Sequence, residues 1–180
     1  MAVAPDRLVL IGELANDERV DRLGSSYFDD FTDADWERFQ DEMDEEASTF
    51  CRDCSDPEEL HAFVEQWNWD KGIGPLNEII RNPACETATA LMAYWMADPE
   101  GFLPSADREA VLSSGDDVER FDFITDIETR YLSGGFARGK IAYDPGGAEE
   151  CRVGQYDNRR DTFVRALPTI MYLPVPRKPA

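Results

Sequence analysis

The stretch from residue 56 to residue 95 constrains the fold of this chain most strongly, because it contains three successive helix patterns. Asp56 is followed by Pro57 and Glu59, which predicts a helix that starts at Pro57 behind an N-cap carboxylate and a capping box. Four large apolar side chains then recur at the spacing of one helical face: Leu60, Phe63, Val64 and Trp67. We expect that face to lie in a core.

Two further helices are predicted directly after the first. The first helix should end near Lys71–Gly72, because glycine adopts the left-handed conformation of a helix end at little cost. Gly74-Pro75 starts a second, short helix, and Asn82-Pro83 ends it. The third helix, from Ala84 to Ala97, is apolar on almost every side, so we expect it to be buried on several sides.

The remainder of the chain predicts shorter elements and one long helix. Asp107–Leu112 is expected to form a short helix, and Asp116 caps a long helix that Gly134-Gly135 ends. Ile141 to Tyr143 is a candidate strand, and Phe163 to Tyr172 is a candidate extended segment interrupted by proline. The apolar run near the N-terminus, LVLI, fits a strand or a helix equally well, and periodicity does not decide between them.

These patterns predict a mainly α fold, a single compact helical domain with at most a few short strands. Residues 1–55 are expected to form an acidic N-terminal region packed on the same domain, residues 56–174 the helical core domain, and residues 175–180 an extended tail. We expect a single core shared by the four main helices, which start at Pro57, Pro75, Pro83 and Asp117. Trp67 and Trp95 should be buried in it.

Polar, aromatic and small residues in and after this stretch form a signature: Asn68-Trp69-Asp70 with Gly72, Asn82-Pro83-Ala84-Cys85, Thr89-Ala90-Leu91, Tyr94-Trp95, Asp98-Pro99, Ile127-Glu128, Tyr131, Tyr143-Asp144-Pro145, Leu167-Pro168 and Met171. On these residues the chain resembles the bacterial family called domain of unknown function 4274, from Asp56 to about Pro174. The resemblance implies a compact bacterial domain and supplies no activity. Lys71 stands where the family pattern has a second acid, which argues against a carboxylate pair there.

The charge of the chain is strongly negative and unevenly distributed. The chain has 38 acidic and 18 basic residues, a formal net charge of −20, and its first 60 residues contain 19 of those acids and 5 of the bases, a net charge of −14. Such a field repels nucleic acid and anionic membranes and attracts cations. We therefore expect a basic protein as the partner, with no direct binding to nucleic acid or membrane.

The sequence also predicts a cytoplasmic location. No stretch approaches the roughly 20 apolar residues that a transmembrane helix requires. The first residues, MAVAPDRLVLIG, contain an acid ahead of a short apolar run, which does not fit a secretory signal.

An acidic helix is predicted after Thr32, which can cap it together with Asp35. An apolar stripe follows at helical spacing: Trp36, Phe39, Met43, Ala47 and Phe50. We expect this stripe to face the core and the many carboxylates to face outward. The predicted partner-binding residues are these carboxylates and three aromatic neighbours: Tyr27, Phe28, Phe31, Asp33, Glu37, Asp41, Glu42, Asp44, Glu45 and Glu46. The alternative is that the carboxylates form a solvated face that only keeps the protein soluble.

No metal and no cofactor is expected. Cys51 and Cys54 have the spacing of a metal or redox pair, but a zinc site usually needs a second close pair, and only His61 with Cys85 or Cys151 could supply it. We therefore expect reduced, structural cysteines.

Two other ion-binding patterns fail on inspection. The acidic run that starts at Asp29 has Ala34 and Gln40 where a calcium loop requires glycine and glutamate. The segment from Gly134 to Lys140, GGFARGK, has the glycine and lysine spacing of a phosphate loop, but a helix precedes it and Ile141 replaces the hydroxyl residue.

Catalytic residues are not expected, because the sole histidine lies in no nucleophile motif. The best candidate for a small site is Asn68, Trp69 and Asp70, although these residues also fit a helix end whose polar side chains tie loose backbone. Three functions remain. The first is an interaction protein, of the immunity or antitoxin type, that inhibits a basic, nuclease-like toxin; the alternatives are a small enzyme using the Asn68 to Asp70 region and a structural accessory domain.

Overall fold

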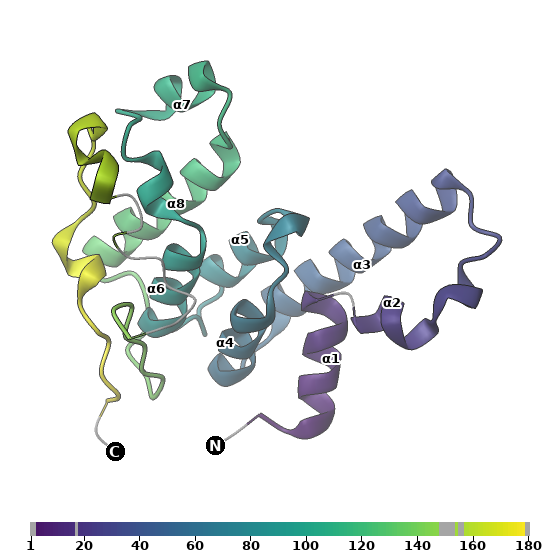
Figure 1. The fold of residues 1–180 in the computed structure, drawn as a ribbon. Helices are drawn as coiled ribbons and strands as arrows, with labels where there is room; N and C mark the ends of the chain where they lie inside the picture. Colours follow the sequence, from purple (N-terminus) through teal and green to yellow (C-terminus); the bar gives the residue numbers. More distant parts are fainter. Residues whose placement is uncertain (1–2, 17, 148–153, 155–156, 179–180) are drawn as a thin grey trace. The chain divides into compact units, whose positions relative to one another are not determined.

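The computed structural model of the chain describes residues 3–16, 18–147, 154 and 157–178. In these residues it contains eight α-helices, short 3-10 helices and no sheet (Figure 1). This confirms the predicted mainly α class. The chain divides into two compact units, Met1–Cys85 and Glu86–Ala180.

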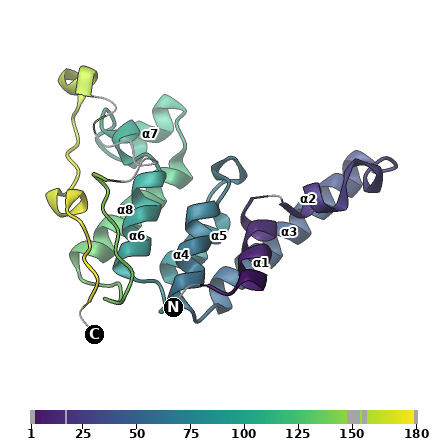
Figure 2. The ribbon, with the colours of Figure 1, turned by 60° about the horizontal axis from the view of Figure 1, so that its bottom comes forward.

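The first unit is built around the long helix α3. Its elements are α1 (Pro5–Ala15), α2 (Glu18–Leu23), η1 (Ser25–Tyr27), α3 (Asp33–Asp53), α4 (Pro57–Gln66), η2 (Trp69–Lys71) and α5 (Gly74–Arg81). α1 packs on α4 and on α3, and α5 packs on α3 (Figure 2). In both views the N-terminal half of α3 extends beyond α4 and α5, with α2 beside it (Figures 1 and 2).

The predicted start of α3 is confirmed. The amide of Asp35 donates to Oγ1 of Thr32 at 3.3 Å, and the amide of Thr32 donates to Oδ2 of Asp35 at 3.0 Å. This capping box satisfies two backbone amides that the helix itself leaves without partners. The run near the N-terminus that fitted strand or helix lies in α1 and is helical.

Helix α4 starts at Pro57 as predicted, but the hydrogen bonds that cap its start, and the residue at which it ends, differ from the prediction. Asp56 accepts from the amide of Glu58 at 2.9 Å, whereas Glu59 does not close a capping box because its carboxylate binds Arg7 at 2.6 and 2.8 Å. The helix ends at Gln66, not near Lys71–Gly72. Trp67 leaves the helical conformation, and its indole N–H donates to the carbonyl of Gly72 at 2.9 Å.

The second unit is centred on two packed helices. Its elements are α6 (Thr87–Met96), η3 (Pro99–Phe102), α7 (Arg108–Ser114), α8 (Val118–Leu132), η4 (Asp157–Thr162) and η5 (Thr169–Tyr172). α6 and α7 both pack on α8. Eight consecutive residues of α6, Ala88 to Trp95, are buried, which confirms that this helix is covered on several sides.

Two helix starts in this unit were predicted wrongly. The third helix begins at Thr87, not at Ala84, because the amide of Ala84 donates to the Asn82 side chain at 2.8 Å in a turn. The cap of α8 is Asp117, whose carboxylate accepts from the amide of Arg120 at 2.9 Å. Asp116 instead accepts from the hydroxyl of Ser114 at 2.5 Å.

The two extended segments predicted near the C-terminus are also different. Tyr143 forms one isolated antiparallel bridge with Val175, through hydrogen bonds of 3.1 and 2.8 Å, and no strand. The segment Phe163 to Tyr172 contains η5, which starts after Pro168 because proline fixes a backbone angle that suits a helix start. Residues 175–178 of the predicted tail pair back onto the chain, since the amide of Lys178 donates to the carbonyl of Gly139 at 3.1 Å, and the last two residues of that tail lie outside the described residues.

The two predicted core tryptophans are buried. Trp67 is 4% exposed in the first unit and Trp95 is 3% exposed in the second. α4 and α5 thus belong to one compact unit, and α6 and α8 belong to the other. That the four helices share a single core stays a prediction, as do the boundaries drawn at residues 55 and 174. Among the described residues, no helix is long and apolar enough to cross a membrane.

Candidate functional site

The outer face of α3 is a surface of carboxylates. All seven acidic residues predicted to bind a partner are exposed: Asp33, Glu37, Asp41, Glu42, Asp44, Glu45 and Glu46. Of the predicted apolar stripe on the other side of the helix, Met43 and Ala47 are buried, whereas Trp36, Phe39 and Phe50 are only partly buried. The helix therefore separates an apolar inner face from an acidic outer face, as its sequence predicts.

A few arginines offset part of this charge. Arg19 from α2 binds Glu46 at 2.7 Å, and Arg38 binds Asp35 at 3.4 Å within α3. Arg22 binds the buried carboxylate of Glu13 on α1 at 3.0 Å. Arg19 and Arg38 thus offset two acids of α3, Glu46 and Asp35, and the larger number of acids leaves the outer face negative.

An aromatic cluster lies at the N-terminal end of α3. Its members are the three predicted aromatic residues and two from the helix stripe: Tyr27, Phe28, Phe31, Trp36 and Phe39. Phe28 is 9% exposed and stacks on Trp36 with 4.6 Å between the ring centroids. Tyr27 is 53% exposed, and Phe31 is partly exposed. Phe28 thus supports the cluster from inside, while the rings of Tyr27 and Phe31 remain accessible to solvent.

The Asn68, Trp69 and Asp70 region forms the short helix η2 and its cap. Oδ1 of Asn68 accepts from the amide of Asp70 at 3.1 Å, and the amide of Asn68 donates to the carbonyl of Ala15 at 2.8 Å. The indole N–H of Trp69 is covered and has no hydrogen-bond partner among the described residues. Asn68 thus stabilises the local backbone through these two hydrogen bonds, as expected if this region is a helix end with a structural role.

A cavity of about 340 Å³ lies between this region and α3. It is lined by Val20 from α2, by five residues of α3 and by two of η2: Trp36, Phe39, Gln40, Met43, Asp44, Asp70 and Lys71. Asp44 and Asp70, which the sequence assigned to two separate candidate sites, line the same cavity. The side chain of Lys71, where an acid was expected, lies over the Trp67 ring with its Nζ 5.6 Å from the ring centroid.

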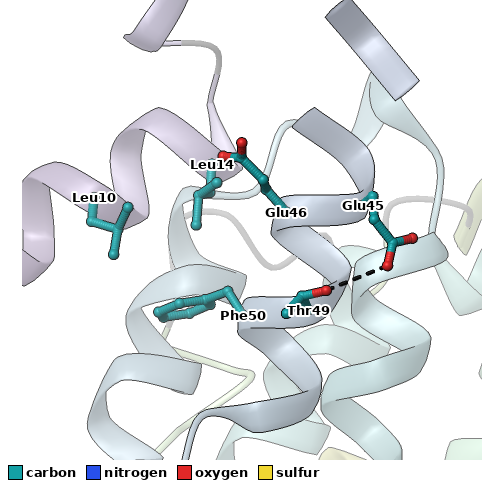
Figure 3. A pocket seen from close by; sticks show the side chains of 6 residues that line it. All are labelled: Leu10, Leu14, Glu45, Glu46, Thr49 and Phe50. Atoms are coloured by element: carbon teal, nitrogen blue, oxygen red, sulfur yellow. Dashed lines mark hydrogen bonds between the residues drawn. The ribbon is translucent and has the colours of Figure 1, made fainter. Parts of the chain in front are cut away.

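A second hollow, a groove of about 370 Å³, lies between α1 and α3. Leu10 and Leu14 project from α1 toward Phe50 of α3 (Figure 3). Glu45, Glu46 and Thr49 of α3 complete the lining, and the hydroxyl of Thr49 donates to Oε1 of Glu45 at 3.4 Å (Figure 3). The groove therefore has an apolar floor and a carboxylate edge. The sequence did not predict it, because it depends on how α1 packs against α3.

Cys51 and Cys54, at the C-terminal end of α3, are free thiols. Burial raises the pKa of the Cys51 thiol well above its usual range, and burial is also the main cause that raises the pKa of Cys54 to about 11. Both thiols are therefore protonated at neutral pH and unreactive as nucleophiles. Cys151 lies outside the described residues, and within them no group of three or more potential ligands is placed to hold a metal ion.

The phosphate-loop pattern in the second unit has a structural role. The amides of Lys140 and Ile141 donate to the carboxylate of Glu86 at 3.3 and 3.0 Å. A Cβ atom at Gly139 would overlap that carboxylate, so a larger residue there would displace the Glu86 side chain from its present position. The loop thus binds an anion that belongs to its own chain.

The fold and this surface define a mainly helical protein whose longest helix exposes a row of carboxylates. Residues 55–132, from two residues before α4 to the end of α8, match the model of the family described as Domain of unknown function (DUF4274), which confirms the resemblance seen in the sequence. The match ends at residue 132, so the family positions suggested around Tyr143 and Leu167 stay predictions. No match was found among curated proteins or solved structures.

Proposed function

We propose that this protein binds a basic protein through the acidic face of α3, as an immunity or antitoxin-type inhibitor of a nuclease-like toxin in the cytoplasm. The observation that supports this most is the placement of the charge. The carboxylates are gathered on the exposed face of one helix whose N-terminal half extends beyond α4 and α5 (Figure 1).

The chemistry of a nuclease suits such a surface. A protein that binds nucleic acid has basic side chains that contact phosphates, and a row of carboxylates on a rigid helix can occupy the same side chains. Opposite charges also steer the two proteins together and speed their encounter, an effect that salt screens. A surface that serves only to keep the protein soluble does not require its carboxylates to be concentrated on one helix.

The aromatic cluster supplies what charge alone does not. Exposed charge pairs contribute little net binding energy, and a few large aromatic anchors usually contribute most of it. Tyr27 and Phe31 lie beside the first turn of α3, and Phe28 holds both rings in place through edge-to-face contacts at 4.9 and 5.0 Å. The proposed surface therefore runs from these rings along the carboxylates of α3.

The test is a pair of charge-reversed variants with the same net charge. Glu42→Lys with Glu45→Lys changes the acidic face, and Glu109→Lys with Glu119→Lys changes exposed acids of α7 and α8; each Glu→Lys adds two charges, so both pairs move the net charge from −20 to −16. The wild type and both variants are used to capture proteins from cells that produce the chain.

The proposal requires a basic protein that the wild type and the Glu109/Glu119 variant retain and the Glu42/Glu45 variant loses. Retention by all three forms at low salt would mean that the acidic face is only a solvated surface. Loss from both variants would mean that net charge matters and the position of the charge does not.

A further inference from the structure

We infer that the groove between α1 and α3 receives an apolar side chain from an amphipathic, basic helix of the partner. This inference rests on the proposed function and adds to it the kind of segment that the acidic face recognises. Its basis is the combination of an apolar floor, formed by Leu10, Leu14 and Phe50, with a carboxylate edge at Glu45 and Glu46.

The residues that line the groove suit both the apolar face and the basic side chains of such a helix. An apolar side chain gains free energy when it leaves water for the floor of the groove. Lysines or arginines one turn before or after it would then lie near Glu45 and near Glu42, which precedes Glu45 by one turn on α3, whereas Glu46 already binds Arg19. A helix with apolar residues on one face and cations beside them satisfies both conditions, as in other helix-in-groove complexes.

The floor of the groove is held rigid from below. Phe50 stacks on the buried ring of Phe63 with 5.7 Å between the centroids, and the guanidinium of Arg7 lies 5.3 Å from the Phe50 ring centroid. Arg7 is held in turn by two hydrogen bonds to Glu59, of 2.8 and 2.6 Å.

The carboxylate edge is held as well. Arg19 binds Glu46 at 2.7 Å, and Thr49 donates to Glu45 at 3.4 Å. A groove whose walls are already ordered requires little further ordering when a partner binds, which favours affinity.

The experiment uses two synthetic peptides of about 18 residues, long enough to form a helix on the protein surface. Both contain the same numbers of leucine, lysine and alanine. One places leucine on a single helical face, and the other distributes leucine around the helix. Binding to the full chain is measured by fluorescence anisotropy at low salt.

Three variants locate the binding. Thr49→Trp fills the groove from α3, and Leu10→Lys places a cation in it from α1. Ser48→Trp adds the same ring at the neighbouring position of α3, which does not line the groove. Circular dichroism spectra check that each variant is folded. If one of the two groove variants is not folded, the other one still tests the groove.

The expected result is that the amphipathic peptide binds the wild type and Ser48→Trp about tenfold more tightly than the scrambled peptide, and that Thr49→Trp and Leu10→Lys lose this preference. Equal binding of both peptides to every form would overturn the groove and leave the proposed acidic surface standing. If neither peptide binds at low salt, the groove proposal fails, and the proposed function is decided separately by the capture experiment with the charge-reversed variants.

Discussion

Asn82 connects the C-terminal end of α3 to the turn that follows α5. Its side-chain amide donates to the carbonyls of Cys51, Arg52 and Cys54 at 2.8, 3.0 and 2.8 Å, and its Oδ1 accepts from the amide of Ala84 at 2.8 Å. Carbonyls at a helix end have no partner within the helix, so this one side chain satisfies several of them. Asn82 is one of the residues on which the family resemblance rests, and its role in this protein is structural.

We predict that Asn82→Ala lowers the free energy of unfolding by about 2–3 kcal/mol, because the side chain is buried and its removal leaves polar backbone groups without partners. Asn77→Ala is the matched control, since Asn77 is only partly buried and donates to the carbonyl of Ile73 at 3.1 Å. It should cost less than about 1 kcal/mol. Urea unfolding of both variants measures the difference, and equal losses would contradict this role.

His61 should make the stability depend on pH. Burial lowers the pKa of His61 to about 4 in the folded protein, whereas an unfolded histidine has a pKa of about 6.5. The unfolded state therefore binds a proton first as the pH falls below about 6.5, and this reduces the free energy of unfolding until the pH approaches the folded value.

Between pH 7 and pH 5 this contribution should be no more than about 2 kcal/mol. It is measured as the difference between the wild type and His61→Gln in urea unfolding at the two pH values, because the carboxylates of the chain titrate in both forms. A wild type that loses no more stability than His61→Gln would show that His61 stays accessible to protons in the folded protein.

At the scale of the helices, the starts of α3 and α4 follow from capping signals in the sequence, whereas the end of α4 does not follow from its apolar periodicity. The start of α3 follows from Thr32 and Asp35, and the start of α4 follows from Asp56 and Pro57, because each involves residues only a few positions apart. The end of α4 was predicted too late, since it depends on a hydrogen bond from Trp67 to Gly72 that periodicity does not reveal.

The two buried tryptophans should contribute strongly to the stability of the folded protein. Trp67 lies against Phe63 with 5.4 Å between the centroids, and the indole N–H of Trp95 donates to the carbonyl of Met171 at 2.7 Å. We predict that Trp67→Ala and Trp95→Ala each lower the free energy of unfolding by about 3–5 kcal/mol. The partly exposed Trp69 is the control, and urea unfolding should show a smaller loss for Trp69→Ala. A loss as large for Trp69→Ala would contradict the packing.

At the scale of the whole molecule, the charge distribution was readable from the sequence and the hollows were not. The acidic face of α3 follows from the helical spacing of Met43 and Ala47, which fixes where the neighbouring carboxylates point. The groove joins Leu10 and Leu14 to Phe50, residues about forty positions apart, and the sequence contains no signal for how their helices pack. The same holds for the cavity that brings Asp44 and Asp70 together.

Site-specific crosslinking in living cells tests most directly whether the acidic face of α3 is a binding surface. A photoreactive amino acid replaces Glu45 on α3 in one form and Glu109 on α7 in another, both exposed. The proposal predicts that the probe at position 45 crosslinks to a protein of net positive charge and that the probe at position 109 does not. Equal crosslinking from both positions, or crosslinking from position 45 only to acidic proteins, would contradict it.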